Sequence, residues 1–257
     1  MADTIPPARM RTRRTSMGIL PMTSCMGTAT TTEALEPLAL LRLLQLVSPA
    51  LPIGAFNFSQ GMEYAIEVGW VRDESAARDW ILGLMRHGVG TLDIPLLAGM
   101  HDAWAVGDAS AARELSARLI ASRETQELRE EDRHLGRSLA RVLYGIGLVE
   151  AESWQRSDDA TLAAMFSMAA VHSAVPRGAT CAGYLWAWCE NQAIAAVKLL
   201  PLGQSAGQRV LEMLRLEIPS ICDAALDLNE SAIGSATPGL CIASCHHETQ
   251  YTRLFRS

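Results

Sequence analysis

The stretch ATCAGYLWAWCENQAIAAVKLL, from Ala179 to Leu200, decides how the rest of the chain is interpreted. It is apolar on nearly every side, which is typical either of a membrane span or of a helix at the centre of a bundle. The charged Glu190 and Lys198 lie within it, and charges at membrane depth are costly. The sequence therefore predicts a central helix of a helical bundle and no membrane span.

The segments around this stretch repeat the helical spacing of apolar residues. Pro37 suits the first turn of a helix that runs to Val47. Asp73 can cap the helix that carries Trp80 and Ile81, and we expect Gly88 and Gly90 to end it. Further helices are expected over 62–69, 93–104, 128–146, 157–170 and 221–228. With no alternating β-branched run and no hairpin turn, the predicted fold is an all-α, single-domain bundle of about nine or ten helices with an extended C-terminal tail.

The ends of the chain differ in character. Residues 1–33 have no apolar periodicity and no continuous apolar run of the kind a secretory signal carries, so we expect a disordered extension. Residues 34–257 form the predicted helical domain, which includes the tail 238–257. The net charge of −6 excludes a typical nucleic-acid binder. Six cysteines without a C-x-x-C pair are typical of reduced thiols in a cytoplasmic protein.

The common catalytic motifs are absent from this sequence. The single lysine, Lys198, is followed by Leu199, so the chain has no P-loop, and it has no H-E-x-x-H, G-x-S-x-G or G-x-G-x-x-G. We therefore expect no enzyme activity and no bound cofactor. The run Cys245, His246, His247 and Glu248 contains metal-ligating types, and a stand-alone metal-binding protein or metalloenzyme is the alternative. Adjacent residues rarely complete a metal site, so a structural or interface role is favoured for them.

The last seven residues are unusually rich in interface-forming types for a chain with 5% aromatic residues. Tyr, Phe and Arg anchor protein interfaces because they bury much area or make directional hydrogen bonds. The expected partner-binding residues are Tyr251, Arg253, Leu254, Phe255 and Arg256. The alternative is a tail that folds back on its own core.

Five more residues are predicted to face a partner. Arg137 and Arg141 have no acidic residue three or four positions away, which leaves them free for another subunit. Lys198 lies at the end of the apolar helix, where a helix dipole also favours a cation. Gln60 and Glu63 follow an irregular segment with two aromatic residues, and we expect both on a partner-facing surface.

Three blocks of sequence resemble the urease accessory protein UreF family. They are SPALPIGAFNFSQGMEYAIEVGW (Ser48–Trp70), YLWAWCENQAIAAVKLLPLGQSAGQR (Tyr184–Arg209) and PGLCIASCHHETQYTRLFRS (Pro238–Ser257), supported by LDIPLLAGMHDAW (Leu92–Trp104) and ELREEDRHLGRSLARVL (Glu127–Leu143). The resemblance extends from Leu38 to Ser257. Where the family pattern has Ser, this chain has Asn57, and where it has Ser-Arg, this chain has Cys245-His246.

The resemblance implies a non-enzymatic, all-helical homodimer that acts as a nickel-insertion chaperone component. Such proteins join the accessory protein UreD (also called UreH) and the GTPase UreG to deliver nickel to apo-urease, with UreE as the indirect nickel donor. Nickel is then handled by the complex and GTP is bound by the partner GTPase. The tail residues Tyr251, Arg253, Leu254, Phe255 and Arg256 are assigned by this resemblance to the UreD/UreH side. Gln60, Glu63, Lys198, Arg137 and Arg141 become candidates for the UreG or dimer side.

Overall fold

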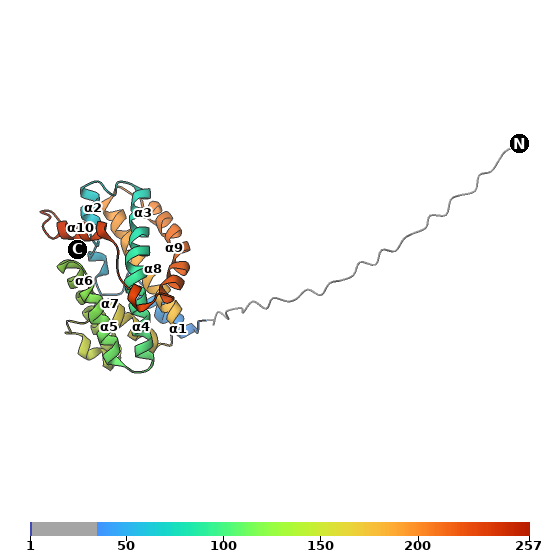
Figure 1. Cartoon of the computed structure of the whole chain (residues 1–257), viewed down its shortest axis with the longest axis vertical. Coiled ribbons are helices and arrows are strands. Elements are labelled where there is room, and N and C mark those ends of the chain that lie inside the picture. The colour runs from blue at the N-terminus through green and yellow to red at the C-terminus, as the bar shows by residue number, and fades with distance from the viewer. Residues whose placement is uncertain (2–34) are drawn as a thin grey trace. The chain divides into compact units, whose positions relative to one another are not determined.

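The apolar stretch forms α8 (Arg177–Leu199), which packs against α9 (Gln204–Leu226) and α4 (Ile94–Ala105) at the centre of a helical bundle. The computed structural model describes Met1 and residues 35–257, and the expected disorder of residues 1–33 lies outside this range apart from Met1. The other α-helices are α1 (Pro37–Leu46), α2 (Met62–Glu67), α3 (Glu74–Leu84), α5 (Ala109–Ala121), α6 (Gln126–Gly145), α7 (Leu162–His172) and α10 (Pro238–His247). The described residues contain these ten α-helices and no strand, which confirms the predicted all-α class (Figure 1).

The remaining helices pack around this centre. α4 packs against α5 and α7, and α6 packs against α7. α9 packs against α3, and α2 lies against α10, the helix that leads into the tail (Figure 1). Most buried apolar side chains form one continuous core, which also includes Phe255 near the end of the chain. None of the helices in the described part of the chain is both long and apolar enough to cross a bilayer.

Two predicted helix starts are confirmed, and another is wrong. Pro37 occupies the first turn of α1, and the carboxylate of Asp73 accepts the N–H of Ala76 at the start of α3. The helix expected over 157–170 does not begin at Ser157, because Thr161 caps α7 by accepting the N–H of Ala164. The hydroxyl of Ser157 instead accepts a hydrogen bond from Arg113.

Gly88 and Gly90 do not end a helix, contrary to the prediction. The chain continues from α3 through a π-helical segment, Met85–Asp93, directly into α4. A side chain at Gly90 would place its Cβ 2.6 Å from the Cγ2 of Ile221, so the glycine allows α9 to approach closely. The carbonyl of His87, released from regular α-helical pairing, accepts the N–H of Ala236 at 2.9 Å. Backbone groups of a distant loop thus stabilise the continuous helix.

Candidate functional site

The segment before α2 aligns this short helix with α10. Gly61 has a positive φ of 74°, a conformation that favours glycine. A Cβ at this position would lie 3.0 Å from the Cβ of Ala243, so the absence of a side chain lets α10 pack against α2. This packing turns Glu63, in the first turn of α2, toward the interior, where it is 8% exposed.

The last five residues return to this same place. The N–H of Arg256 donates to the carbonyl of Asn57 at 2.8 Å, and the N–H of Ser59 donates to the carbonyl of Ser257 at 2.7 Å. The side chain of Phe255 is 5% exposed and belongs to the main core. We call residues 253–257 the tail segment. We call the five residues that bond to it, Asn57, Ser59, Glu63, Glu127 and Glu131, the socket.

Glu63 holds the backbone of the tail segment. Its carboxylate accepts the N–H of Leu254 at 2.7 Å on one oxygen and the N–H of Phe255 at 2.9 Å on the other. Two successive backbone N–H groups thus share one buried carboxylate, and charge-assisted bonds of this kind are stronger than neutral ones. The side chain therefore supports the fold of its own chain.

Glu127, on α6, joins the tail segment to α10. Its carboxylate accepts a hydrogen bond from Arg253 at 2.7 Å and lies 2.7 Å from the Nδ1 of His247. The other ring nitrogen of His247 is 3.3 Å from Glu63, and the imidazole is completely buried. Two carboxylates, one guanidinium and one imidazole therefore form a single network under the tail.

Glu131, one turn further along α6, receives the end of the tail segment. The hydroxyl of Ser257 donates to it at 2.7 Å, and the amide of Gln60 donates to its other oxygen at 2.8 Å. The indole of Trp188 donates to the same Gln60 amide at 2.8 Å, which connects α6 to α8. Burial raises the pKa of Glu131 to about 7, against the lowering effect of the bonds from Ser257 and Gln60.

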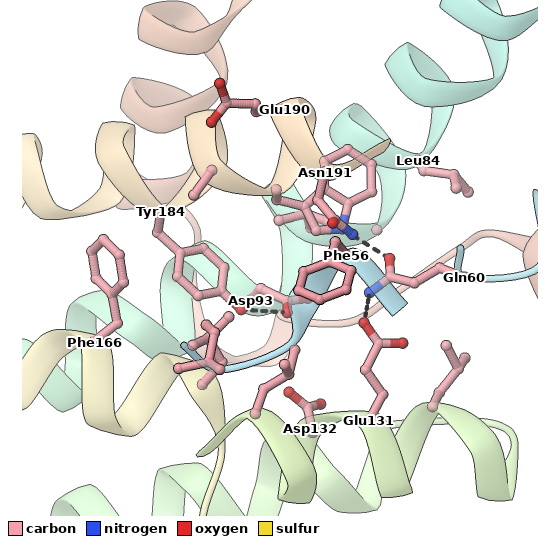
Figure 2. Close-up of a pocket in the computed structure, with 18 of the residues that line it drawn as sticks. Phe56, Gln60, Leu84, Asp93, Glu131, Asp132, Phe166, Tyr184, Glu190 and Asn191 are labelled. Carbon is pink, nitrogen blue, oxygen red and sulfur yellow. Dashed lines mark hydrogen bonds between the residues drawn. The ribbon is translucent and has the colours of Figure 1, made fainter. Parts of the chain in front are cut away.

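A cavity of about 120 Å³ lies beside this network (Figure 2). Its wall carries a buried charge group in which Arg123 donates to Asp132 at 2.6 Å and to both oxygens of Asp93. Tyr184 lies 3.4 Å from Asp93 on the same wall. Burial alone would lower the pKa of Arg123, but Asp132 and Asp93 raise it well above its ordinary value. The guanidinium therefore stays charged and holds α6 to the start of α4.

The other tail residues remain on the surface. Tyr251 is fully exposed, Leu254 is 66% exposed, and Arg253 and Arg256 are also exposed. Phe255 is not exposed: in this structure it fills a pocket of its own chain, and its contact with a partner stays a prediction. Gln60 is half-buried and Glu63 is buried, and both side chains make hydrogen bonds within the chain, so their placement on a partner-facing surface also stays a prediction.

The three basic candidates are differently placed. Lys198 is exposed, donates to the carbonyl of Phe56 at 3.4 Å, and lies 5.5 Å from the ring of Phe255, within cation–π range. Arg137 is half-buried and donates to the carbonyl of Ser157 at 2.8 Å, a partner twenty residues away that helical spacing could not reveal. Arg141 is exposed, and its guanidinium donates a hydrogen bond to the hydroxyl of Ser138.

The candidate metal ligands on α10 point in different directions. Cys245 is exposed, and the ring of His246 stacks on Tyr64 with centroids 4.9 Å apart. His247 is buried between two carboxylates, and Glu248 accepts the N–H groups of Gln126 and Glu127 at the start of α6. Within the part of the chain that the structure describes, no three His, Cys, Asp or Glu side chains are arranged to hold a metal ion.

The sequence reasoning missed the buried acids of α6. Glu131 and Asp132 stand between Leu128 and Leu135, on the apolar face of a helix whose other face is charged. Acidic residues in such a stripe need internal partners, and this signal was available in the sequence. Their partners, Arg123 and Ser257, were not, because neither lies within three or four positions of the acid that it contacts.

Comparison with known proteins gives a consistent result. The family model described as UreF matches residues 71–215. The chain is 47% identical to the urease accessory protein UreF of Alkalilimnicola ehrlichii over 226 residues, which cover 88% of this chain and 99% of that protein. It is 46% identical to the UreF of Chromohalobacter salexigens, with 86% and 96% covered, and 41% identical to that of Hahella chejuensis, with 87% and 100% covered.

Proposed function

The chain belongs to the UreF family of urease accessory proteins, and we propose that it joins a UreD/UreH-type protein to the GTPase UreG during urease maturation. In this role it helps to deliver nickel to apo-urease in a GTP-dependent assembly. GTP is bound by the partner, nickel passes through the complex, and UreE supplies the metal indirectly. The chain itself acts as a chaperone component and not as an enzyme.

The tail supports this proposal most directly. Its last five residues are held on the body by buried carboxylates, yet Leu254 among them is exposed, as is Tyr251 just before them. Large apolar side chains on a firmly held segment lose little conformational entropy when a partner covers them. We therefore assign Tyr251, Arg253, Leu254 and Arg256 to the UreD/UreH side, with Phe255 supporting them from below.

We further propose a homodimer with an apolar helical interface. The outer side of α1 exposes Leu38, Leu41 and Leu44, which are spaced three residues apart and so share one face. In the part of the chain that the structure describes, all three side chains are mostly exposed. An apolar stripe of this kind is typical of a helix that packs against another protein surface. Of the basic candidates, Arg141 and Lys198 remain exposed for contact with UreG or a second protomer.

The alternative function is that of a stand-alone metal-binding protein, and the positions of the candidate ligands give it little support. It rested on Cys245, His246, His247 and Glu248, whose side chains diverge on α10. Stoichiometric tight nickel binding by the isolated chain would restore it.

The test is deletion of this gene followed by a urease assay with and without excess nickel. We expect little urease activity in the deletion strain, partial recovery in excess nickel, and full recovery on complementation. Co-purification of the complementing protein with the UreD/UreH protein and UreG identifies the assembly. Normal urease activity without the gene would overturn the proposal.

A further inference from the structure

The tail segment is bound through its main-chain groups and through three of its side chains. All four residues from 254 to 257 use a main-chain group. Leu254 and Phe255 donate their N–H groups to the Glu63 carboxylate, and Arg256 and Ser257 pair with the main chain of Asn57 and Ser59. Recognition through main-chain bonds, with pockets for alternate side chains, is a recurrent mode of peptide binding. The socket has both properties.

Three side chains of the tail segment contact the body, although Arg253 among them also remains exposed to solvent. Arg253 bonds to Glu127, Phe255 enters the core, and Ser257 bonds to Glu131. Leu254 and Arg256, between them, are exposed. The chain bends at Leu254 and Phe255, and the body contacts the side chains at the first, third and fifth positions of the segment.

The connection between α10 and the tail segment adds little to this binding. Residues 249–252 are largely exposed, and the recorded hydrogen bonds of Thr249 and Gln250 are local, to His246 and His247. The contacts that hold the tail segment therefore depend on its own residues and not on its covalent attachment. An identical segment from another molecule would make the same contacts.

We propose that the socket is a peptide-binding site that also accepts the tail segment of a second copy of this chain. The exchange requires the chain's own tail to leave the socket by a rearrangement of the exposed residues 249–252. Swapping an identical element creates no new kind of contact, which makes it a low-cost route to association. This inference does not depend on the role in urease maturation.

Complementation between two full-length variants tests the exchange. The first variant carries an N-terminal affinity tag and Phe255→Ala, so that its socket is intact and its own tail docks weakly. The second is untagged and carries Glu63→Gln, so that its tail is intact and its socket is weakened. We expect the tagged variant to retain more of the second variant than of a matched control that carries both Glu63→Gln and Phe255→Ala. Equal retention of both would overturn the proposal, whatever other dimer contact exists.

A second measurement avoids any dependence on the folding of these variants. A protease site placed within residues 249–252 allows the folded full-length protein to be cut there, and a fluorescent peptide of residues 251–257 is then added. We expect saturable binding by fluorescence anisotropy. An unlabelled Phe255→Ala peptide should compete at least about tenfold more weakly than the natural peptide, whereas a Leu254→Ala peptide should compete equally. No exchange of peptide, or unfolding of the body on cutting, would show that the tail is an integral part of the fold.

Discussion

The carboxylate of Glu63 accepts the backbone N–H of Phe255 at 2.9 Å, across 192 positions of the sequence. The same carboxylate also accepts the N–H of Leu254. A side chain near the start of the domain therefore fixes the backbone next to the aromatic ring that closes the core. The position of the exposed tail residues depends on this buried contact.

Replacement of Glu63 with Gln should loosen the tail without unfolding the body. The amide keeps one acceptor oxygen, but its NH₂ group faces a backbone N–H that then has no acceptor, a loss of about 1–3 kcal/mol. We expect hydrogen exchange at the amides of Leu254 and Phe255 to accelerate by at least about tenfold. Glu67→Gln, an exposed residue on the same helix, is the matched control and should leave both amides protected. Unchanged exchange in Glu63→Gln would show that this contact does not hold the tail.

Phe255→Ala should weaken tail docking, while Leu254→Ala should not. Truncation of a buried Phe lowers the free energy of unfolding by about 3–5 kcal/mol when the residue unfolds together with the whole domain. Because the tail segment follows an exposed connection, we expect it to undock locally, so that global stability falls by less than this. Urea unfolding measures the global loss, and the rate of carboxypeptidase digestion measures undocking. A loss of about 3 kcal/mol or more in urea would contradict local undocking.

The helices that could be predicted are those with a wide apolar stripe and a recognisable end. Pro37 and Asp73 mark such starts, and α1 and α3 begin there. α5 (Ala109–Ala121) was missed because its buried face begins with the small residues Ala112 and Ser116, which give little contrast with the polar face. The π-helical passage through Gly88 could not be predicted, because its stability depends on the distant loop at Ala236.

The sequence predicted which residues form the tail part of the candidate site, but it predicted their positions only in part. The sequence identified an anchor-rich tail, and it left open whether the tail docks on a partner or folds onto its own core. The structure divides the residues between these outcomes: Phe255 is buried in the core of its own chain, whereas Tyr251 is exposed to solvent. That division depends on Glu63 and Glu127, which lie more than a hundred residues away and carry no local mark of their role.

Glu131 should make stability depend on pH. Its pKa is raised from 4.5 to about 7 in the folded protein, so the folded state binds more protons than the unfolded state between these values. The contribution of this group is therefore fully present below pH 4.5 and is lost as the pH rises through about 7, with an upper bound of roughly 3 kcal/mol.

Glu131→Gln removes this titration and should flatten the pH dependence of stability. Urea midpoints at pH 5 and pH 7.5 provide the measurement, and the difference between them should shrink in the variant. Glu130→Gln, which changes an exposed neighbour, should retain the natural difference. An equal difference in all three proteins would assign the pH dependence to other groups.

Arg123→Met should be strongly destabilising. Arg123 is the charged partner of both Asp93 and Asp132, and its removal leaves two buried carboxylates without it. Loss of one partner from a buried ion pair typically costs about 3–5 kcal/mol. Adding Asp93→Asn and Asp132→Asn to Arg123→Met should restore part of the stability, since the neutral amides do not repel each other. Urea unfolding of the single and triple variants measures both effects, and a triple variant no more stable than the single one would argue against charge as the cause.

Tyr251→Ala combined with Leu254→Ala should impair assembly with the UreD/UreH protein and leave the fold intact. Both side chains are exposed in the isolated chain, so their truncation creates no cavity and should not change the melting temperature appreciably. If they are anchors of the interface, each truncation costs about 2 kcal/mol or more, which corresponds to roughly thirty-fold weaker binding. Thr252→Ala, an exposed substitution between them, is the matched control. Pull-down with the UreD/UreH protein, beside a melting curve for each variant, distinguishes binding from folding. Undiminished binding by the double variant would place the interface on another surface. A lower melting temperature would show that these two side chains contribute to the stability of the fold.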